Sequence, residues 1–218
     1  MKIINAYVEL INAPEYETML NTVETAGRVC YKSEERMGPG TAEPFIRGII
    51  KRGHEAVLEH SSITVRFVCD RGVTHEIVRH RMSSYCMEST RYCNYANGKF
   101  GEEITVIRPS FFKPWDEMEL EDKYKYLAWS NGCQRAEESY LAMIHRGASA
   151  QEARSVLPHS VKAELIMTAN VREWRHFLKL RNNPAAHPQT KEVAGLLQDE
   201  LVKRYPVFFE DLNHEQQD

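Results

Sequence analysis

Apolar and polar residues alternate in several short stretches of the chain, which is the pattern of β-strands. The alternation is clearest at residues 62–69, where an apolar side chain recurs at every second position. Residues 2–11 are rich in Ile, Val and Tyr and predict a strand near the start of the chain. Two further strands are predicted at residues 104–107 and 161–168.

Elsewhere, apolar residues recur with the 3.6-residue period of amphipathic helices. Helices are predicted at residues 15–29, from residue 41 or 42 to Gly53, and at residues 117–146, 151–157, 171–180 and 187–205, with a loop at residues 35–40. At 1.5 Å per residue the helix at 117–146 would be about 45 Å long. Because one small core does not need such a length, we expect part of this helix to lie between subunits. The chain has no repeat, low-complexity tract or linker, which predicts one α+β domain over residues 1–218.

The hydrophobic content is sufficient for a folded core. The net charge disfavours a general nucleic-acid binder. Of the 218 residues, 42% are hydrophobic and 10% are aromatic. The net charge is −3 and the pI is about 6.3, whereas a nucleic-acid binder would need a broad basic surface. A local basic pocket that binds a small anion is more compatible with this slightly acidic net charge than a broad basic surface.

Cysteine usage and the start of the chain suggest a cytoplasmic protein. The five cysteines are odd in number and form no CxxC pair, which supports neither a disulfide framework nor a zinc site. The first residues lack the basic start and long apolar run of a signal peptide, and no stretch approaches the roughly 18 apolar residues of a membrane span. We therefore expect no membrane association.

The densest group of anion-binding side chains lies at residues 79–91, where Arg-His-Arg at 79–81 precedes Ser-Thr-Arg at 89–91. A guanidinium offers phosphate oxygens a rigid fork of donors, and hydroxyl and loop N–H groups can complete the cradle. A solvated surface run is the alternative interpretation. The density favours a binding site for a phosphorylated ligand.

A short helix is predicted to lead into this group. Asp70 can serve as its N-cap, and Val73, Ile77 and Val78 would form one apolar face. Because successive helical residues point about 100° apart, the side chains at 79–81 would fan out from the helix end in three directions. Such a fan suits several ligand groups better than a single ion.

Two other patterns are weaker. His54 and His60 are six residues apart, whereas a zincin motif needs two histidines four residues apart on one helical face, so we predict no metal site. Cys86 lies between arginines that would lower a thiol pKa, but no base can be named for it, and a small buried hydrophobe is the preferred interpretation. Neither GxGxxG nor GxxxxGK[ST] occurs, which excludes a Rossmann or P-loop phosphate turn.

The second half of the chain holds a matching set of polar residues. Arg154 lies on a short predicted helix, where a surface pair with Glu152 is the alternative role. Asn170, Arg172, His176 and Arg181 recur along the helix at 171–180 and at its C-terminal end. A solvated face accounts well for Arg175 and Lys179 on that helix. It accounts less well for Asn170, His176 and Arg181, which alternate with large apolar side chains.

Arg79-His80-Arg81, seven residues and then Ser89 resembles the signature of the flavin-dependent thymidylate synthases. Further blocks are similar to the family in the same order, over about residues 20 to 210: Gly53-His54-Glu55 with Glu59-His60, Glu152-Ala153-Arg154 with Leu157-Pro158, and Asn170-Val171-Arg172 through Leu180-Arg181 to His187. The resemblance implies the α+β fold of that family, a mixed sheet flanked by helices including one long helix.

The resemblance also implies an activity and its partners. The reaction is the reductive methylation of dUMP to dTMP, with 5,10-methylenetetrahydrofolate as the one-carbon donor, NADPH as the reductant and bound FAD as the hydride carrier. It implies a homotetramer whose active sites lie where subunits meet. A hydride delivered by flavin would remove the need for an enzyme nucleophile, so the resemblance implies that Cys86 is not catalytic.

Residue roles follow from the same resemblance. The flavin positions match His54, Arg79, His80, Arg81, Asn170, Arg172 and His176. The dUMP positions match Glu76, Arg79, Met87, Glu88, Ser89, Thr90, Arg91, Arg154 and Arg181. Arg181 matches the residue that contacts the uracil ring, where a cation would stabilise negative charge developing in the pyrimidine.

The chain departs from the family pattern at two places. Cys86-Met87 stands where the family often has Asn-Glu or Ser-Gln, so backbone contacts are expected there. Glu76 stands where Gln is often found beside dUMP, and we expect its carboxylate to turn away from a phosphate. Ser89, without a neighbouring base, is expected to bind phosphate and not to act as a nucleophile. Two alternatives remain: a non-enzymatic nucleotide- or RNA-binding module using Arg79, Arg81 and Arg91, and a flavoprotein acting on another pyrimidine nucleotide.

Overall fold

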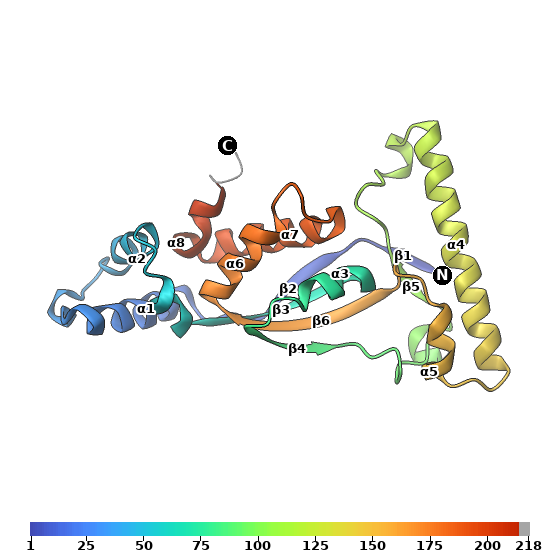
Figure 1. Ribbon diagram of the computed structural model, residues 1–218, viewed down its shortest axis with the longest axis horizontal. Helices are drawn as coiled ribbons and strands as arrows, with labels where there is room; N and C mark the ends of the chain where they lie inside the picture. Colours follow the sequence, from blue (N-terminus) through green and yellow to red (C-terminus); the bar gives the residue numbers. More distant parts are fainter. Residues whose placement is uncertain (214–218) are drawn as a thin grey trace. The chain divides into compact units, whose positions relative to one another are not determined.

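The computed structural model describes residues 1–213 and consists of strands and helices in the α+β class (Figure 1). The strands are β1 Lys2–Ile4, β2 Tyr7–Asn12, β3 Ser62–Asp70, β4 Ser83–Met87, β5 Thr105–Ile107 and β6 Lys162–Asn170. The α-helices are α1 Tyr16–Tyr31, α2 Ala42–Lys51, α3 Arg71–Ile77, α4 Leu120–His145, α5 Ala150–Ala153, α6 Val171–Arg181, α7 Pro188–Arg204 and α8 Pro206–Phe209. Among the described residues, no helix combines the length and the apolar character that a membrane crossing requires.

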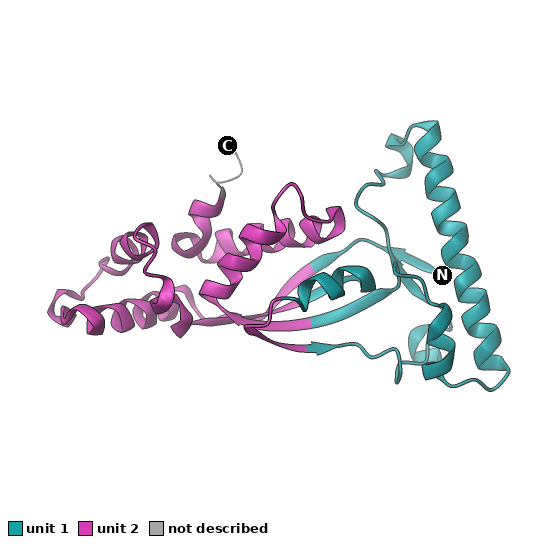
Figure 2. Cartoon of the chain, viewed as in Figure 1, with its two compact units in different colours: residues 1–7, 67–79, 86–165 teal, residues 8–66, 80–85, 166–218 magenta. Residues whose placement is uncertain are grey.

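The chain divides into two compact units, each built from separate stretches of sequence (Figure 2). Unit 1 comprises residues 1–7, 67–79 and 86–165, and unit 2 comprises residues 8–66, 80–85 and 166–218. Strands β3, β4 and β6 each pass from one unit into the other along the chain.

The strands form two sheets. A four-stranded sheet has the order β2-β3-β6-β4, and β1 pairs in parallel with β5, with Lys2 opposite Thr105. The single strand predicted at residues 2–11 is therefore wrong, because β1 and β2 belong to different sheets. Strand β4 lies where the sequence suggested only a polar segment. Its side chains are mostly exposed, so the apolar alternation that identifies a strand is absent.

The core of unit 1 is formed where α4 packs beside β5. Tyr140 and Cys133 of α4 are buried with Ile104 and Val106. Glu137 of α4 is also buried, and its carboxylate accepts a hydrogen bond from the Ile104 N–H at 2.9 Å. The helix has 26 residues, about 39 Å at 1.5 Å per residue, which confirms the predicted long helix except for its first turn.

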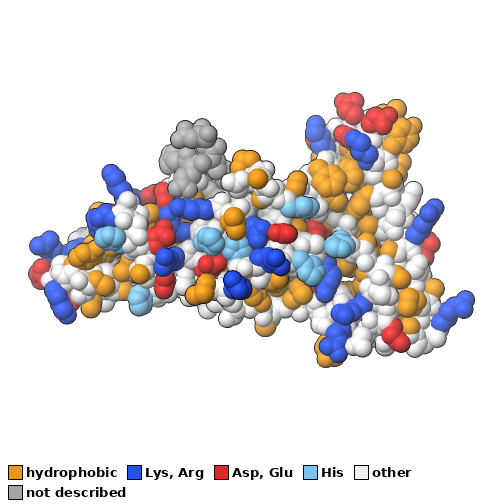
Figure 3. Space-filling model, in the orientation of Figure 1, with side chains coloured by type: hydrophobic (Ala, Val, Ile, Leu, Met, Phe, Trp, Pro, Cys, Tyr) orange, Lys and Arg blue, Asp and Glu red, His pale blue; other side chains and the backbone are white. Residues whose placement is uncertain are grey.

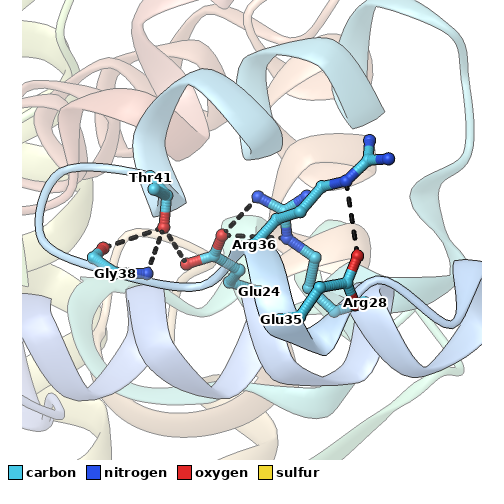
Figure 4. A network of polar contacts seen from close by, with 6 residues as sticks. All are labelled: Glu24, Arg28, Glu35, Arg36, Gly38 and Thr41. Carbon is cyan, nitrogen blue, oxygen red and sulfur yellow. Dashed lines mark hydrogen bonds and ion pairs between the residues drawn. The ribbon is translucent and has the colours of Figure 1, made fainter.

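The N-terminal half of unit 2 contains α1 and α2, joined by a polar network around the buried Glu24 (Figure 4). The Glu24 carboxylate accepts hydrogen bonds from Arg28 at 2.8 Å and from the Thr41 hydroxyl at 3.1 Å. Thr41 Oγ1 also accepts from the Gly38 N–H at 3.0 Å. These contacts fix the connection at residues 35–40, which was predicted as a loop, between the two predicted helices.

The C-terminal half of unit 2 packs α6 against α7 and α7 against α8. Helix α6 agrees with the prediction for residues 171–180, and its N-cap Asn170 accepts from the Glu173 N–H at 2.9 Å. The helix predicted at residues 187–205 is not the last one. Tyr205 interrupts it, and α8 starts at Pro206, which fits the first position of a helix because that position needs no N–H.

Candidate functional site

Two cavities, one in each unit, are lined by some of the polar residues singled out by the sequence. The cavity of unit 1 has a volume of about 510 Å³ and is lined by Arg71, His75, Thr90, Gln151, Arg154, Ser155, Leu157, Pro158 and His159. Two of these residues, Thr90 and Arg154, were predicted to bind a nucleotide. Arg71, His75, Gln151 and His159 were not.

A short helix with a strong N-terminal cap positions Arg154. Ser149 and Glu152 form a capping box at the start of α5, in which Ser149 Oγ accepts from the Glu152 N–H and Glu152 accepts from the Ser149 N–H. Glu152 is therefore committed to the cap and does not pair with Arg154. Arg154 follows α5 directly, and its Nη1 donates to the Thr90 hydroxyl at 3.4 Å.

Arg91 is held beside the same cavity. Its Nε donates to Gln151 Oε1 at 2.8 Å, and its guanidinium lies 5.5 Å from the centroid of the Tyr92 ring. The Gln151 contact connects the loop after β4 to the start of α5, 60 residues later in the chain. Gln151 could not be identified as a site residue from the sequence, because an isolated Gln has no characteristic spacing.

Helix α3 forms another part of this cavity. Asp70 is the predicted N-cap, and the structure confirms it, since Asp70 Oδ1 accepts from the Val73 N–H at 2.8 Å. The backbone N–H of Arg71 lies 3.0 Å from the His159 carbonyl oxygen. Arg71 Nη1 is buried and makes no hydrogen bond within residues 1–213. A buried donor without a partner is costly, so Arg71 is a candidate for binding an anion in this cavity. The signal that the sequence offered for Arg71 was its position directly after strand β3.

Other predicted substrate residues have structural contacts. The Glu88 carboxylate accepts from the Tyr95 hydroxyl at 2.9 Å and pairs with Lys162 Nζ at 2.8 Å. Met87 is exposed at the end of β4, and Ser89 Oγ accepts weakly from the Arg91 N–H at 3.4 Å. Glu76 is half-buried within α3. Glu88 therefore contributes to unit 1 through its side chain even without a ligand.

The Arg-His-Arg group does not continue the helix before it. Helix α3 ends at Ile77 with Val78 as its C-cap, so the 100° helical fan does not apply. Instead the turn leaves Arg79 and Arg81 exposed and His80 buried. The two arginines are thus accessible to a ligand, and the histidine belongs to the interior of unit 2.

The cavity of unit 2 lies along α6. It has a volume of about 380 Å³ and is lined by Glu55, Glu59, Met82, Asn170, Arg172, Glu173, Arg175, His176 and Lys179. The predicted cofactor residues Asn170, Arg172 and His176 all lie on it. Arg172 Nη1 donates to Glu59 Oε1 at 2.6 Å, and both side chains are about half exposed, so the pair can open toward an anionic ligand. The amide, guanidinium and imidazole groups fit a polar cofactor that carries phosphate.

Two predictions for residues near α6 differ in outcome. Arg175, which was predicted to lie on a solvated face, is 1% exposed, and that prediction is wrong. Its guanidinium makes two parallel hydrogen bonds to Asp211 at 2.7 and 2.6 Å. Lys179 is exposed as predicted.

His54 is exposed and is not among the residues that line the cavity. Its Nδ1 lies 2.7 Å from the Tyr31 hydroxyl.

His80 connects both ends of α6 through its imidazole. Its Nδ1 lies 3.0 Å from Glu173 Oε1, and its Nε2 accepts a hydrogen bond from Arg181 Nε, also at 3.0 Å. Burial lowers the pKa of His80 below its ordinary value of 6.5, and the nearby Arg181 and His176 act in the same direction, while Glu173 opposes them. His80 is therefore held neutral near pH 7.

The same group of side chains resembles a metal site in part. One ligand atom each from His80, Glu173 and His176 lie within 4.8 Å of one another. However, both ring nitrogens of His80 already face partners, and one partner is the permanent cation Arg181, which would repel a metal ion. The geometry suits a hydrogen-bonded chain better than a metal centre.

Comparison with known proteins gives consistent results. A family model described as thymidylate synthase complementing protein matches residues 10–207. A protein from Pyrococcus furiosus named flavin-dependent thymidylate synthase is 33% identical over 192 residues, covering 85% of this chain and 75% of that protein. A protein of the same name from Thermococcus onnurineus is 35% identical over 191 residues, covering 84% of this chain and 74% of that protein.

A solved structure has the same fold. It is the crystal structure of a UMP/dUMP methylase, PolB, from Streptomyces cacaoi bound with 5-Br dUMP. Its TM-score is 0.79 at 25% sequence identity, and the alignment covers 98% of this chain and 97% of that one.

Proposed function

Because this chain belongs to the thymidylate synthase complementing protein family, whose relatives are flavin-dependent thymidylate synthases, we propose that it methylates dUMP to dTMP in a flavin-dependent reaction. The chain is an enzyme of the methyltransferase class.

The observation that carries the proposal is the anion-binding chemistry of the unit 1 cavity. Thr90 and Arg154 are already in contact there, and Arg71 presents a buried donor without a partner. A phosphate monoester supplies several acceptor oxygens for such donors, and a guanidinium can bind two of them at once. We assign this cavity to the phosphate of dUMP, with Arg91 held beside it by Gln151 and with Ser89 as a further ligand.

The cavity along α6 is assigned to FAD. Asn170, Arg172 and His176 line it, and the exposed Arg79, Arg81 and His54 are assigned to the same cofactor on the basis of the family resemblance. When bound, FAD would supply the hydride that completes the methyl group. Arg172 would exchange its partner Glu59 for a phosphate oxygen, since the pair is half exposed and weakly held in water.

Arg181 is assigned to the pyrimidine. Its guanidinium is permanently charged, so it can stabilise negative charge that develops on the uracil ring when the one-carbon unit is attached. A charge that is already in place needs no reorganisation during the reaction, which is why such a group can account for a large part of the rate.

The remaining partners are also proposals. We infer that 5,10-methylenetetrahydrofolate donates the one-carbon unit and that NADPH reduces the flavin. Cys86 is exposed on β4, so the predicted buried position is wrong, and within residues 1–213 its thiol has no hydrogen-bonding base beside it. This supports a reaction without an enzyme cysteine nucleophile.

A homotetramer is supported by the exposed apolar surface of unit 1. Leu120, Tyr124 and Leu127 of α4 are exposed together with Phe111 and Trp115 of the preceding segment. Figure 3 shows hydrophobic side chains along this helix. Exposed apolar groups of this size commonly mark contacts between subunits, in agreement with the expectation that part of α4 lies between subunits.

The direct test is a methylation assay on the purified protein. We expect a flavin absorption spectrum, and conversion of dUMP to dTMP that requires methylenetetrahydrofolate and NADPH together. Arg154→Ala should raise the KM for dUMP because a phosphate ligand is lost, whereas Arg135→Ala, an exposed arginine of α4 outside both cavities, should not. A colourless protein that cannot be reconstituted with FAD would instead support the nucleotide-binding module.

UMP is the second candidate substrate. The structural neighbour is named as a methylase of UMP and dUMP, and the family resemblance by itself does not fix the sugar. The same assay run with UMP in place of dUMP separates the two nucleotides. Higher kcat/KM for UMP would replace dUMP as the substrate and leave the flavin chemistry unchanged.

A further inference from the structure

Glu173 and Arg181 lie near opposite ends of α6. They are eight residues apart, which is about 12 Å along a helix axis at 1.5 Å per residue. His80 lies between them, with a ring nitrogen 3.0 Å from each partner. A residue from a turn distant in the sequence thus connects a carboxylate to a guanidinium.

Only one protonation state of His80 satisfies both contacts. A guanidinium has donors and no acceptor, so His80 Nε2 must offer its lone pair to Arg181 Nε–H. The ring proton is then on Nδ1, where it is donated to Glu173 Oε1. The opposite tautomer, or a protonated ring, would place an N–H against the N–H of Arg181.

The surroundings hold the ring in this orientation. The Phe177 and His176 rings lie with centroids 4.9 and 5.5 Å from that of His80. The Tyr85 hydroxyl donates to the His80 carbonyl oxygen at 2.5 Å and fixes the backbone. His80 is 4% exposed, and the Glu173 side chain is 12% exposed.

We propose that Glu173 and His80 are positioning residues that orient the guanidinium of Arg181 toward the pyrimidine. The proposal rests on the proposed function, in which Arg181 contacts the uracil ring. Glu173 selects the His80 tautomer, and His80 Nε2 anchors Arg181 at its Nε. Neither residue needs to touch the substrate for this role.

The arrangement predicts a dependence on pH. The groups that face His80 are Glu173, His176 and Arg181 of α6, and Tyr85 from β4. Protonation of His80 would remove the acceptor for Arg181 and so misplace the guanidinium. Since the pKa of His80 is lowered from 6.5, activity should be retained at neutral pH and should fall on the acid side below that value.

The decisive variant is Glu173→Gln, which keeps the size of the side chain and removes its charge. We expect kcat with dUMP to fall by about 10- to 100-fold, in line with the cost of a small misplacement of a catalytic group. Because Glu173 also lines the cavity assigned to FAD, kcat is measured per bound flavin. The acid limb of the pH profile should move to lower pH, because the carboxylate that favours protonated His80 is gone. A residue that only stabilised the fold would not shift the acid limb.

Two further variants complete the test. Glu200→Gln is the matched control, because Glu200 is exposed on α7 and lies outside both cavities. His80→Gln keeps an acceptor for Arg181 that cannot be protonated, so it should restore part of the activity lost in His80→Ala and abolish the acid limb. If Glu173→Gln matches Glu200→Gln in kcat and in pH profile, or if His80→Gln keeps the acid limb, the proposal is wrong.

A measurement independent of catalysis separates this proposal from the proposed function. NMR of protein labelled with ¹⁵N at its histidine rings reports the tautomer of each ring, and the His80 signals are identified by their loss in His80→Gln. We expect neutral His80 with its proton on Nδ1, and a smaller excess of that tautomer in Glu173→Gln, because a neutral amide oxygen accepts more weakly than a carboxylate. An Nε2-protonated ring in the native protein would overturn the proposal even if dUMP is methylated. The Nδ1 tautomer in a protein that does not methylate dUMP would leave the contact intact and refute only the assigned reaction.

Discussion

Replacement of Arg175 by alanine should destabilise unit 2 strongly. The guanidinium is 1% exposed, and its Nη1 donates to the Phe208 carbonyl oxygen at 2.5 Å. It also makes the two hydrogen bonds to Asp211, and its Nε lies 3.6 Å from Glu55 Oε1. Arg175 thereby ties α6 to α8 and to the segment that follows α8. Burial acts to lower its pKa, but the Asp211 contact outweighs this, so the pKa of Arg175 is raised.

The magnitude follows from what the substitution leaves behind. Removing one partner of a buried ion pair costs about 3–5 kcal/mol. The lower end of this range applies here because the Asp211 side chain is 40% exposed, so water can solvate part of its charge. A protein of this size loses roughly 2–4 °C in Tm per kcal/mol. The Tm of Arg175→Ala should therefore fall by about 6–12 °C.

Arg172→Ala provides a matched control on the same helix. Arg172 is about half exposed and pairs with Glu59, and such surface pairs contribute roughly 0–1 kcal/mol. Thermal unfolding of the flavin-free proteins, followed by circular dichroism, should show a Tm change below about 4 °C for this variant. Equal Tm values for the two variants would refute the claim that burial makes Arg175 a structural residue.

Three other substitutions test the site. Arg181→Ala should lower dTMP formation by about 10²- to 10³-fold while the flavin spectrum is retained, because a preorganised charge is removed; full activity would contradict its assignment. Cys86→Ser should keep most of its activity in the same assay, and complete loss with normal dUMP binding would restore the nucleophile interpretation. Asp70→Ala should lower the free energy of unfolding in urea by about 1–2 kcal/mol through loss of the α3 N-cap, and an unchanged value would show that the cap is dispensable.

Local patterns in the sequence were sufficient for most of the secondary structure. The strong alternation at residues 62–69 became β3, and the 3.6-residue period at residues 171–180 became α6. The secondary-structure prediction failed where the apolar alternation was weak, or where a strand pairs with a distant segment of the chain. Strand β4 has mostly exposed side chains, and the break between β1 and β2 depends on which strand each one pairs with. Pairing partners are not encoded in a local period.

The candidate site shows the same division. The spacing of Arg79-His80-Arg81 and Ser89, with Arg154 and Arg181 later in the chain, was readable as a family signature. Arg71 and Gln151 carried no such signal and were found only as lining of a cavity. The expectation of a single domain and the assigned roles of the site residues stay predictions.

The sequence by itself therefore determined the α+β class, the positions of most helices and the family, because these depend on residue type and short spacing. The tertiary structure alone decided the environment of each charged group. Arg175 and Arg172 are three residues apart on one helix, yet one is buried and the other exposed. His80 meets Glu173 and Arg181 across 93 and 101 residues of chain, and those contacts set its tautomer and lower its pKa. Burial and hydrogen bonding fix protonation, and both are created by segments that only the fold brings together.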